Sequence, residues 1–196
     1  SADAARLALD LDEARLRDLL PQSLVLVQED GAGRVLQATA LQHPGALDDL
    51  YAAAADGPAL GAHPATTDTA FRLWAPTARA VSVCLYPDDR QHASRREALH
   101  FDPATGIWSA TLPGNLQGRY YDYLVDVHAP GTGLVRNRVT DPYSVSLGAD
   151  SRRGFIADLD APSLKPPGWD AAPRPAPLRA QTDISIYELH VRDFSI

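Results

Sequence analysis

Hydrophobic residues recur at every second position in several short stretches of the chain between residues 70 and 139. In AVSVCLY, for example, Val81, Val83 and Leu85 alternate with smaller or more polar residues. FRLW, GIWSATLP and RYYDYLVDV show the same alternation, and LVRNRV follows them after a glycine-containing turn. A period of two is typical of strands that bury one face. Five such strands, with no helical pattern among them, predict a mainly β chain built around an antiparallel, immunoglobulin-like β-sandwich with Val81, Val83 and Leu85 inside.

The residues before this region predict a small α+β segment. LDEARLRDLLP places leucines near one face of a short helix that ends at Pro21. Two apolar runs flank the glycine-containing turn at residues 30–33 and predict a pair of strands. A second short helix is expected between the proline–glycine pairs near residues 44 and 58, and residues 61–69 are expected to form a loop.

The residues after the sandwich change character twice. A proline-rich stretch predicts an extended linker, and DISIYELHVRDF then carries an apolar run from Ile184 to Val191. A run that is apolar on nearly all sides is typical of a strand buried on both faces, so we expect a strand whose side chains are covered. The expected domains are therefore the α+β segment at 1–65, the sandwich at 66–165, and the linker and strand at 166–196.

Five blocks of this sequence occur in the order found in a known family. They are FRLWAPTARAVSVCLYPDD, GIWSATLPGNLQGRYYDYLVDV, TDPYSVSL, LKPPGWD and DISIYELHVRDFS. In these blocks the chain resembles pullulanase-type α-1,6-glucosidases, including plant limit dextrinases, of the α-amylase family. The resemblance runs from about residue 23 to 196. It implies an N-terminal region, a starch-binding-type module of the isoamylase N-terminal class, and the first strand of a (β/α)8 barrel.

The resemblance also implies the chemistry of the intact enzyme, which is hydrolysis of α-1,6 branch linkages in starch, pullulan and limit dextrins. Such hydrolysis needs two carboxylates, and in this family they lie on barrel strands that the sequence does not contain. We therefore expect accessory domains without catalytic residues, with the α-glucan and the catalytic barrel as partners. His190, Arg192 and Asp193 are interpreted as structural support for the end of the barrel strand. No cofactor is implied, and no calcium ligands can be assigned.

Trp108 and Tyr121 are the candidate carbohydrate-binding residues, because aromatic rings on a sheet can stack on the apolar faces of sugars. The alternative for both rings, as for Trp74, is packing between the sheets. Two other functions stay open at this point. The chain could be a stand-alone α-glucan-binding module, or an immunoglobulin-like interaction domain with no sugar chemistry.

Composition narrows the remaining possibilities. The net charge is −7, from 18 basic and 25 acidic residues, which disfavours nucleic acid and anionic membranes as partners. No apolar stretch approaches the roughly 20 residues of a membrane span. The six scattered histidines do not form a metal-binding pattern, and the single cysteine, Cys84, is interpreted as a small buried hydrophobe. The first residues lack an initiator methionine and a signal-peptide pattern, which favours a processed or truncated start and leaves the compartment open.

Overall fold

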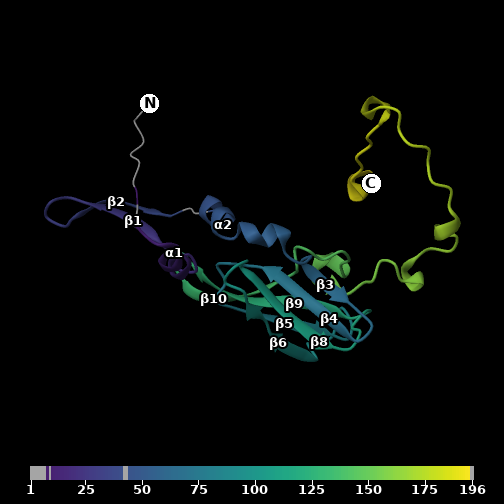
Figure 1. The fold of residues 1–196 in the computed structure, drawn as a ribbon, viewed down its shortest axis with the longest axis horizontal. Helices are drawn as coiled ribbons and strands as arrows, with labels where there is room; N and C mark the ends of the chain where they lie inside the picture. The colour runs from purple at the N-terminus through teal and green to yellow at the C-terminus, as the bar shows by residue number, and fades with distance from the viewer. Residues whose placement is uncertain (1–7, 9, 42–43, 195–196) are drawn as a thin grey trace. The chain divides into compact units, whose positions relative to one another are not determined.

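The computed structural model describes residues 8, 10–41 and 44–194. The chain divides into two compact units, with the division between Asp158 and Leu159. Figure 1 shows the first unit with its strands, and the second as a long chain with a few short helical turns.

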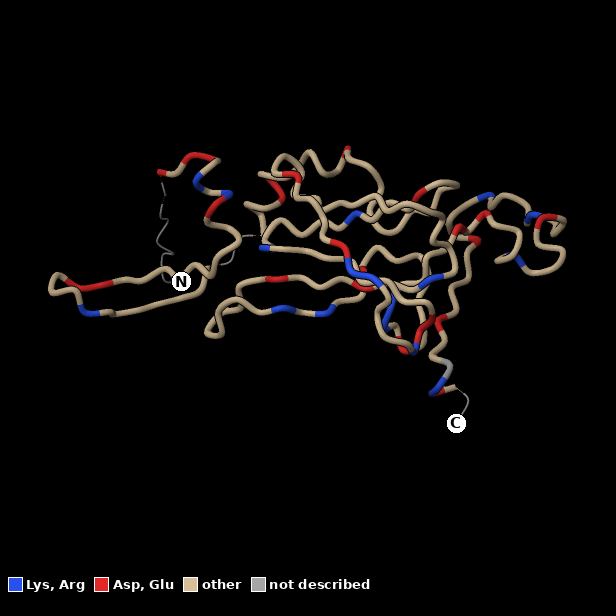
Figure 2. The backbone as a smooth tube through the Cα atoms, turned by 90° about the horizontal axis from the view of Figure 1, so that it is seen from below, with Lys and Arg blue, Asp and Glu red and all other residues tan. Residues whose placement is uncertain are grey.

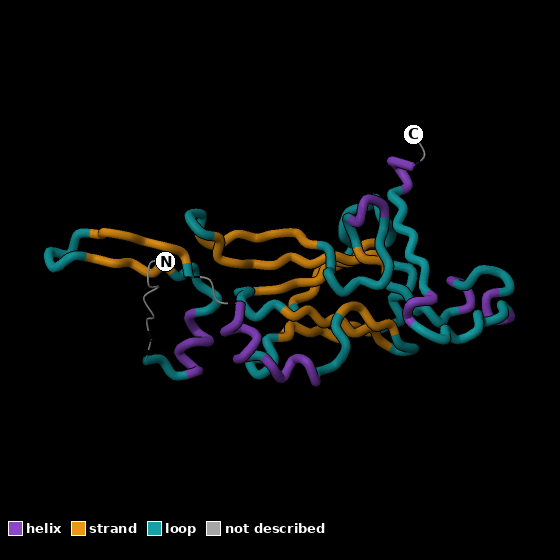
Figure 3. The backbone as a smooth tube through the Cα atoms, turned by 90° about the horizontal axis from the view of Figure 1, so that it is seen from above, coloured by secondary structure: helices purple, strands orange, loops and turns teal. Residues whose placement is uncertain are grey.

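The sandwich in the first unit consists of two antiparallel sheets, which confirms the prediction of a mainly β fold. One sheet has the order β3 (Gly61–Pro64), β4 (Asp68–Trp74), β8 (Ile107–Pro113) and β7 (His100–Phe101). The other has the order β10 (Gly133–Val139), β9 (Tyr120–Ala129), β5 (Ala80–Tyr86) and β6 (Arg95–Ala98), and β11 (Gly154–Phe155) also pairs with β9. Figure 3 shows these strands without an α-helix between them.

The core lies between the two sheets, where the alternating residues of the sequence meet. Val81, Val83 and Leu85 of β5 are 2%, 0% and 1% exposed, so their predicted inward direction is confirmed. They join one hydrophobic cluster with side chains from β4, β8 and β9. The ring of Phe71 meets that of Tyr121 edge to face at 5.4 Å, a geometry that aromatic pairs favour. Cys84 is buried and unpaired, as predicted.

Three short strands, β3, β6 and β7, were not predicted from the sequence pattern. Residues 61–64 were expected to be a loop, but they form β3 and pair with residues 69–72 of β4. The four residues of β6 and the two of β7 are mostly exposed. All three strands lie at sheet edges and have only two to four residues, which are too few to show a regular alternation of apolar residues.

The α+β segment has the predicted elements. Helix α1 (Glu13–Leu19) begins at Asp12, whose side chain accepts a hydrogen bond of 2.7 Å from the backbone N–H of Arg15. Strands β1 (Val25–Glu29) and β2 (Val35–Ala40) form an antiparallel hairpin with every residue exposed. Helix α2 (Pro44–Leu50) and the 3₁₀ turn η1 (Ala52–Asp56) then lead to the sandwich.

The second unit corrects the predicted strand at residues 184–191. Its regular elements are the 3₁₀ turns η3 (Pro162–Leu164), η4 (Trp169–Ala171) and η5 (Gln181–Asp183), and helix α3 (Val191–Phe194). Residues 184–190 have no strand assignment, and Ile186 and Tyr187 are 89% and 79% exposed. Both the strand and its expected burial are therefore wrong for this structure. An apolar run becomes a strand only when its backbone has a ladder partner, and no described segment pairs with it.

Candidate functional site

The two candidate sugar-binding rings both lie in the core. Tyr121 is 1% exposed, and its hydroxyl donates a 2.6 Å hydrogen bond to the carboxylate of Asp141. It offers no free ring face, which argues against the sugar-binding prediction for this residue. Trp108 is 8% exposed, its indole N–H donates to the carbonyl of Ala75 at 3.0 Å, and its ring lies 5.0 Å from that of Phe101.

Trp108 nevertheless borders a hollow of about 280 Å³, which we call the aromatic groove. Its lining comes from the α1 region, from Tyr51, and from the loops and strands around β8, and consists of Arg17, Asp18, Pro21, Tyr51, Pro76, Ala78, Arg79, Phe101, Pro103 and Trp108. The most open ring in it belongs to Phe101, which is 36% exposed. Phe101 could not be predicted from the sequence, because a two-residue edge strand carries no periodic signal.

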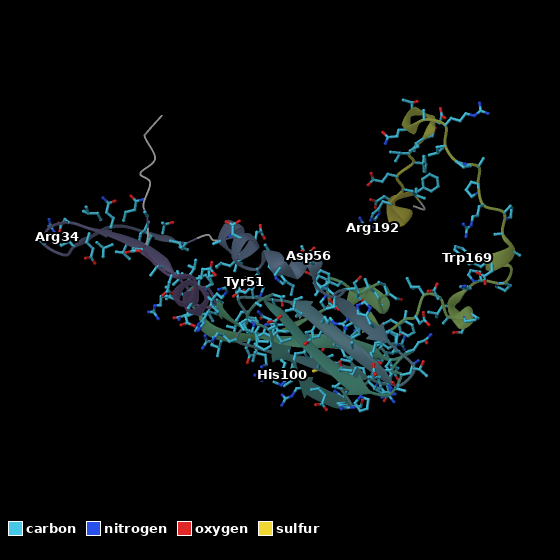
Figure 4. All side chains as sticks on the ribbon, in the orientation of Figure 1. Arg34, Tyr51, Asp56, His100, Trp169 and Arg192 are labelled. Carbon is cyan, nitrogen blue, oxygen red and sulfur yellow. The ribbon has the colours of Figure 1, made fainter. Side chains whose placement is uncertain are left out.

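Arg17 and Tyr51 build one wall of the aromatic groove. The Arg17 guanidinium lies 5.7 Å from the centre of the Tyr51 ring and donates to the carbonyl of Leu50 at 3.1 Å. Its Nε is buried and has no hydrogen-bond partner among the described residues. The Tyr51 ring also packs on Gly106, where φ is +71° and a Cβ would come within 3.0 Å of the ring. Glycine is therefore required at this position. Figure 4 labels Tyr51.

A second hollow, of about 350 Å³, lies on the outer face of the β10–β9–β5–β6 sheet. We call it the arginine pocket, and it is lined by Tyr86, Asp89, His92, Ala93, Asp122, Arg138, Thr140, Arg152 and Arg153. This pocket has no signal in the sequence, because the pairing of β9 with β10 and the loop before β11 bring together residues that are far apart in the chain. Figure 2 shows that basic and acidic positions are interspersed along the backbone.

The floor of the arginine pocket is a buried hydrogen-bonded network. Asp122 is 1% exposed and accepts bonds from the Tyr86 hydroxyl at 2.9 Å and from Nη1 of Arg138 at 3.0 Å. Arg138 also contacts the Tyr86 hydroxyl. Burial raises the pKa of Asp122 to about 7, and the positive charge of Arg153 opposes that rise. The Arg153 guanidinium stacks 3.6 Å from the centre of the Tyr86 ring, and this cation–π contact also stabilises the position of Tyr86 in the network.

The remaining candidate chemistry is local and exposed. Among the described residues there is no group of three or more side chains suited to hold a metal ion. No helix of the described chain is long and apolar enough to cross a membrane. His190 and Asp193 pair at 3.2 Å, and Arg192 and Asp193 pair at 2.9 Å, all within the last described turn of the second unit.

Comparison with known proteins assigns two successive segments of the first unit to known domain families. Residues 2–49 match the pullulanase N2 domain, and residues 59–144 match carbohydrate-binding module 48, the isoamylase N-terminal domain. The chain is 45% identical to chloroplastic pullulanase 1 of Arabidopsis thaliana over 188 residues, which are 95% of this chain and 19% of that protein. It is 36% identical to a pullulanase of Klebsiella pneumoniae over 94% of this chain and 17% of that one.

Solved structures agree with these matches. Apo pullulanase from Klebsiella pneumoniae superposes with a TM-score of 0.74 at 34% identity, covering 82% of this chain and 17% of that chain. A pullulanase from Paenibacillus barengoltzii, in complex with maltohexaose and α-cyclodextrin, gives a TM-score of 0.62 at 38% identity over 75% of this chain and 21% of that one. The chain thus spans about a fifth of the length of these relatives. It is an N-terminal region of a pullulanase-type protein, with an N2 domain followed by a carbohydrate-binding module 48.

Proposed function

We propose that this chain is the accessory, glucan-contacting part of an enzyme that hydrolyses α-1,6 linkages in starch, pullulan or limit dextrins. The similarity to pullulanases along nearly the whole chain supports the enzyme class. The solved complex of Klebsiella pneumoniae pullulanase with maltotriose supports an α-glucan as the ligand class. The alternatives, a stand-alone glucan-binding module or an interaction domain without sugar chemistry, lack this support from full-length relatives.

The aromatic groove is our candidate for the glucan contact, and the exposed ring of Phe101 is the observation that carries it. An α-glucan presents apolar C–H faces and hydroxyl groups to a protein surface. Phe101 offers a ring that is 36% exposed and packs against Trp108, and Arg17 lines the same groove with a guanidinium side chain that is 29% exposed. Ring and donor together match both parts of a sugar. With one open ring, affinity is expected to be weak, in the high micromolar to millimolar range or about −4 to −6 kcal/mol.

Replacing Phe101 by alanine is expected to weaken maltotriose binding at least about fivefold, or roughly 1 kcal/mol. The exposed ring leaves when the side chain is shortened, while the sandwich core is retained because Phe101 lies at an edge. NMR titration with maltotriose measures the effect. Leu134→Ala is the matched control, because Leu134 is an exposed apolar residue of the same sandwich outside the groove. Equal affinities for Phe101→Ala and the unsubstituted chain would remove the groove from the proposal.

The 196-residue chain by itself is expected to release no reducing sugar from pullulan above a buffer control. Glycoside hydrolysis needs two carboxylates that flank the substrate. Asp89 and Asp122 line one pocket, but Asp122 is buried beneath Tyr86 and Arg138 and cannot reach a substrate. A reducing-sugar assay with purified chain tests this. Turnover of pullulan at a rate above the buffer control would overturn the accessory role.

A further inference from the structure

We propose that the arginine pocket binds a phosphate monoester, in particular the phosphate group of a phosphorylated sugar. Arg138, Arg152 and Arg153 line one hollow, and they come from β10 and from the loop that precedes β11. Guanidinium groups bind phosphate oxygens through paired N–H donors, which makes arginine the preferred residue for such ligands. This site is separate from the aromatic groove and does not depend on glucan binding there.

Each guanidinium keeps donors that the described residues do not use. Arg138 is 54% exposed and directs Nη1 to Asp122 and Tyr86. Arg153 directs Nη1 to the carbonyl of Asp88 at 3.0 Å. Arg152 is 61% exposed, and its charged partner is Asp89 at 3.9 Å, beyond hydrogen-bond distance. The other N–H groups of the three side chains therefore remain available to an anion.

The loop that carries two of these arginines is fixed in place. The carboxylate of Asp89 accepts a 3.1 Å bond from the backbone N–H of Ala149, and its other oxygen is buried. A Cβ at Gly148 would lie 2.6 Å from that oxygen, so the close approach requires glycine. The Thr140 hydroxyl contacts the carbonyls of residues 151 and 152 at 2.8 and 3.0 Å.

The backbone beside Arg152 is strained. Asp150 and Ser151 have φ values of +55° and +54°, in the left-handed region that residues with a side chain rarely occupy. Strain of this kind persists where the surrounding structure enforces it, and it concentrates at ligand sites. The enforced loop places Arg152 and Arg153 at the pocket, so binding needs little reorganisation.

The charge that the pocket presents to solvent is positive. Asp122 is 1% exposed and pairs with Arg138, and Asp89 lies 3.9 Å from Arg152. The pocket is lined by three guanidinium groups and two carboxylates, which leaves a surplus of positive charge for an anion. The chain as a whole carries a net charge of −7 and repels anions, which limits binding to this local cluster. About 350 Å³ exceeds the size of a phosphate ion and lies within the range of small-molecule sites, leaving room for the sugar that carries the phosphate.

The test is an NMR titration of the whole chain with inorganic phosphate, glucose 6-phosphate and glucose. Phosphate and glucose 6-phosphate are expected to shift signals around the arginine pocket, and glucose is not. Tighter binding of glucose 6-phosphate supports a phosphosugar site, and equal binding supports recognition of the phosphate group alone. Binding of glucose as strong as that of glucose 6-phosphate, or no binding of either phosphate compound at about 10 mM, would overturn the proposal.

Variants separate the pocket from general charge effects. Arg152→Gln is expected to weaken binding of glucose 6-phosphate about five- to tenfold, since it removes an exposed cation without breaking a buried bond. Arg136→Gln is the matched control, because Arg136 is an exposed arginine of β10 that lies outside the pocket and pairs with Asp126 at 2.6 Å. Equal losses in the two variants would refute a specific site. Phe101→Ala should leave phosphate binding unchanged, so the outcome is independent of the aromatic groove, and thermal melts verify folding.

Discussion

The Trp108→Ala variant is expected to lose about 3–5 kcal/mol of unfolding free energy. Trp108 is 8% exposed within the hydrophobic cluster between the sheets. Its removal leaves a cavity, removes the ring contact with Phe101, and deprives the Ala75 carbonyl of its indole donor. Urea denaturation followed by tryptophan-independent circular dichroism gives the difference directly.

Trp169 supplies the control for this experiment. It belongs to the second unit, is 63% exposed, and its replacement by alanine should change the stability of the sandwich by less than about 0.5 kcal/mol. The contrary result would be a stable Trp108→Ala chain that has lost maltotriose binding. That result would show that the Trp108 indole binds sugar and that it contributes little to the stability of the hydrophobic core.

The sandwich could be predicted because its central strands bury one face each. In β5 and β9 the alternation of Val81, Val83, Tyr121 and Tyr123 follows from the period of two, and each of these side chains is at most 2% exposed. The same alternation favours core packing for Tyr121, since Tyr121 shares a face with Tyr123. Aromatic chemistry suggested a sugar contact, but the register placed the ring in the core.

The strand expected at residues 184–191 shows that an apolar run alone does not determine whether a strand forms. A run of apolar residues specifies which side chains favour burial, but it does not supply the neighbouring strand that satisfies the backbone. In the described chain, the N–H and C=O groups of Ile186 and Tyr187 have no ladder partner, and the side chains stay exposed.

The arginine pocket was beyond prediction for a different reason. Asp122, Arg138 and Arg153 carry no local motif, and only strand pairing and the loop before β11 bring them to one place. A charged residue in a strand is ordinarily interpreted as solvent-facing. Here Asp122 is buried because Tyr86 and Arg138 cover it and provide its hydrogen bonds. Burial of this kind follows from tertiary contacts, not from the pattern along one strand.

The unfolding free energy is expected to decrease as the pH rises from about 4 to about 7. Burial raises the pKa of Asp122 from its ordinary 3.8 to about 7. Within this window the folded chain keeps a proton that the unfolded chain releases, so the contribution is complete below about 4 and is lost as the pH passes 7. At about 1.4 kcal/mol per pKa unit, the loss is roughly 4 kcal/mol. Burial also raises the pKa of Asp141, which adds a change of the same sign.

Asp122→Asn isolates this contribution, because asparagine keeps an oxygen that accepts from Tyr86 and Arg138 but cannot ionise. Most of the decrease between pH 4 and 7 should disappear in urea denaturation measured at steps across that range. Asp126→Asn is the control, since the hydrogen bond from Arg136 lowers the pKa of Asp126 and places its titration below the window. That variant should keep the full decrease. If Asp122→Asn keeps it too, the buried carboxylate is already ionised at pH 4, and its charge pairing with Arg138 outweighs the cost of burial.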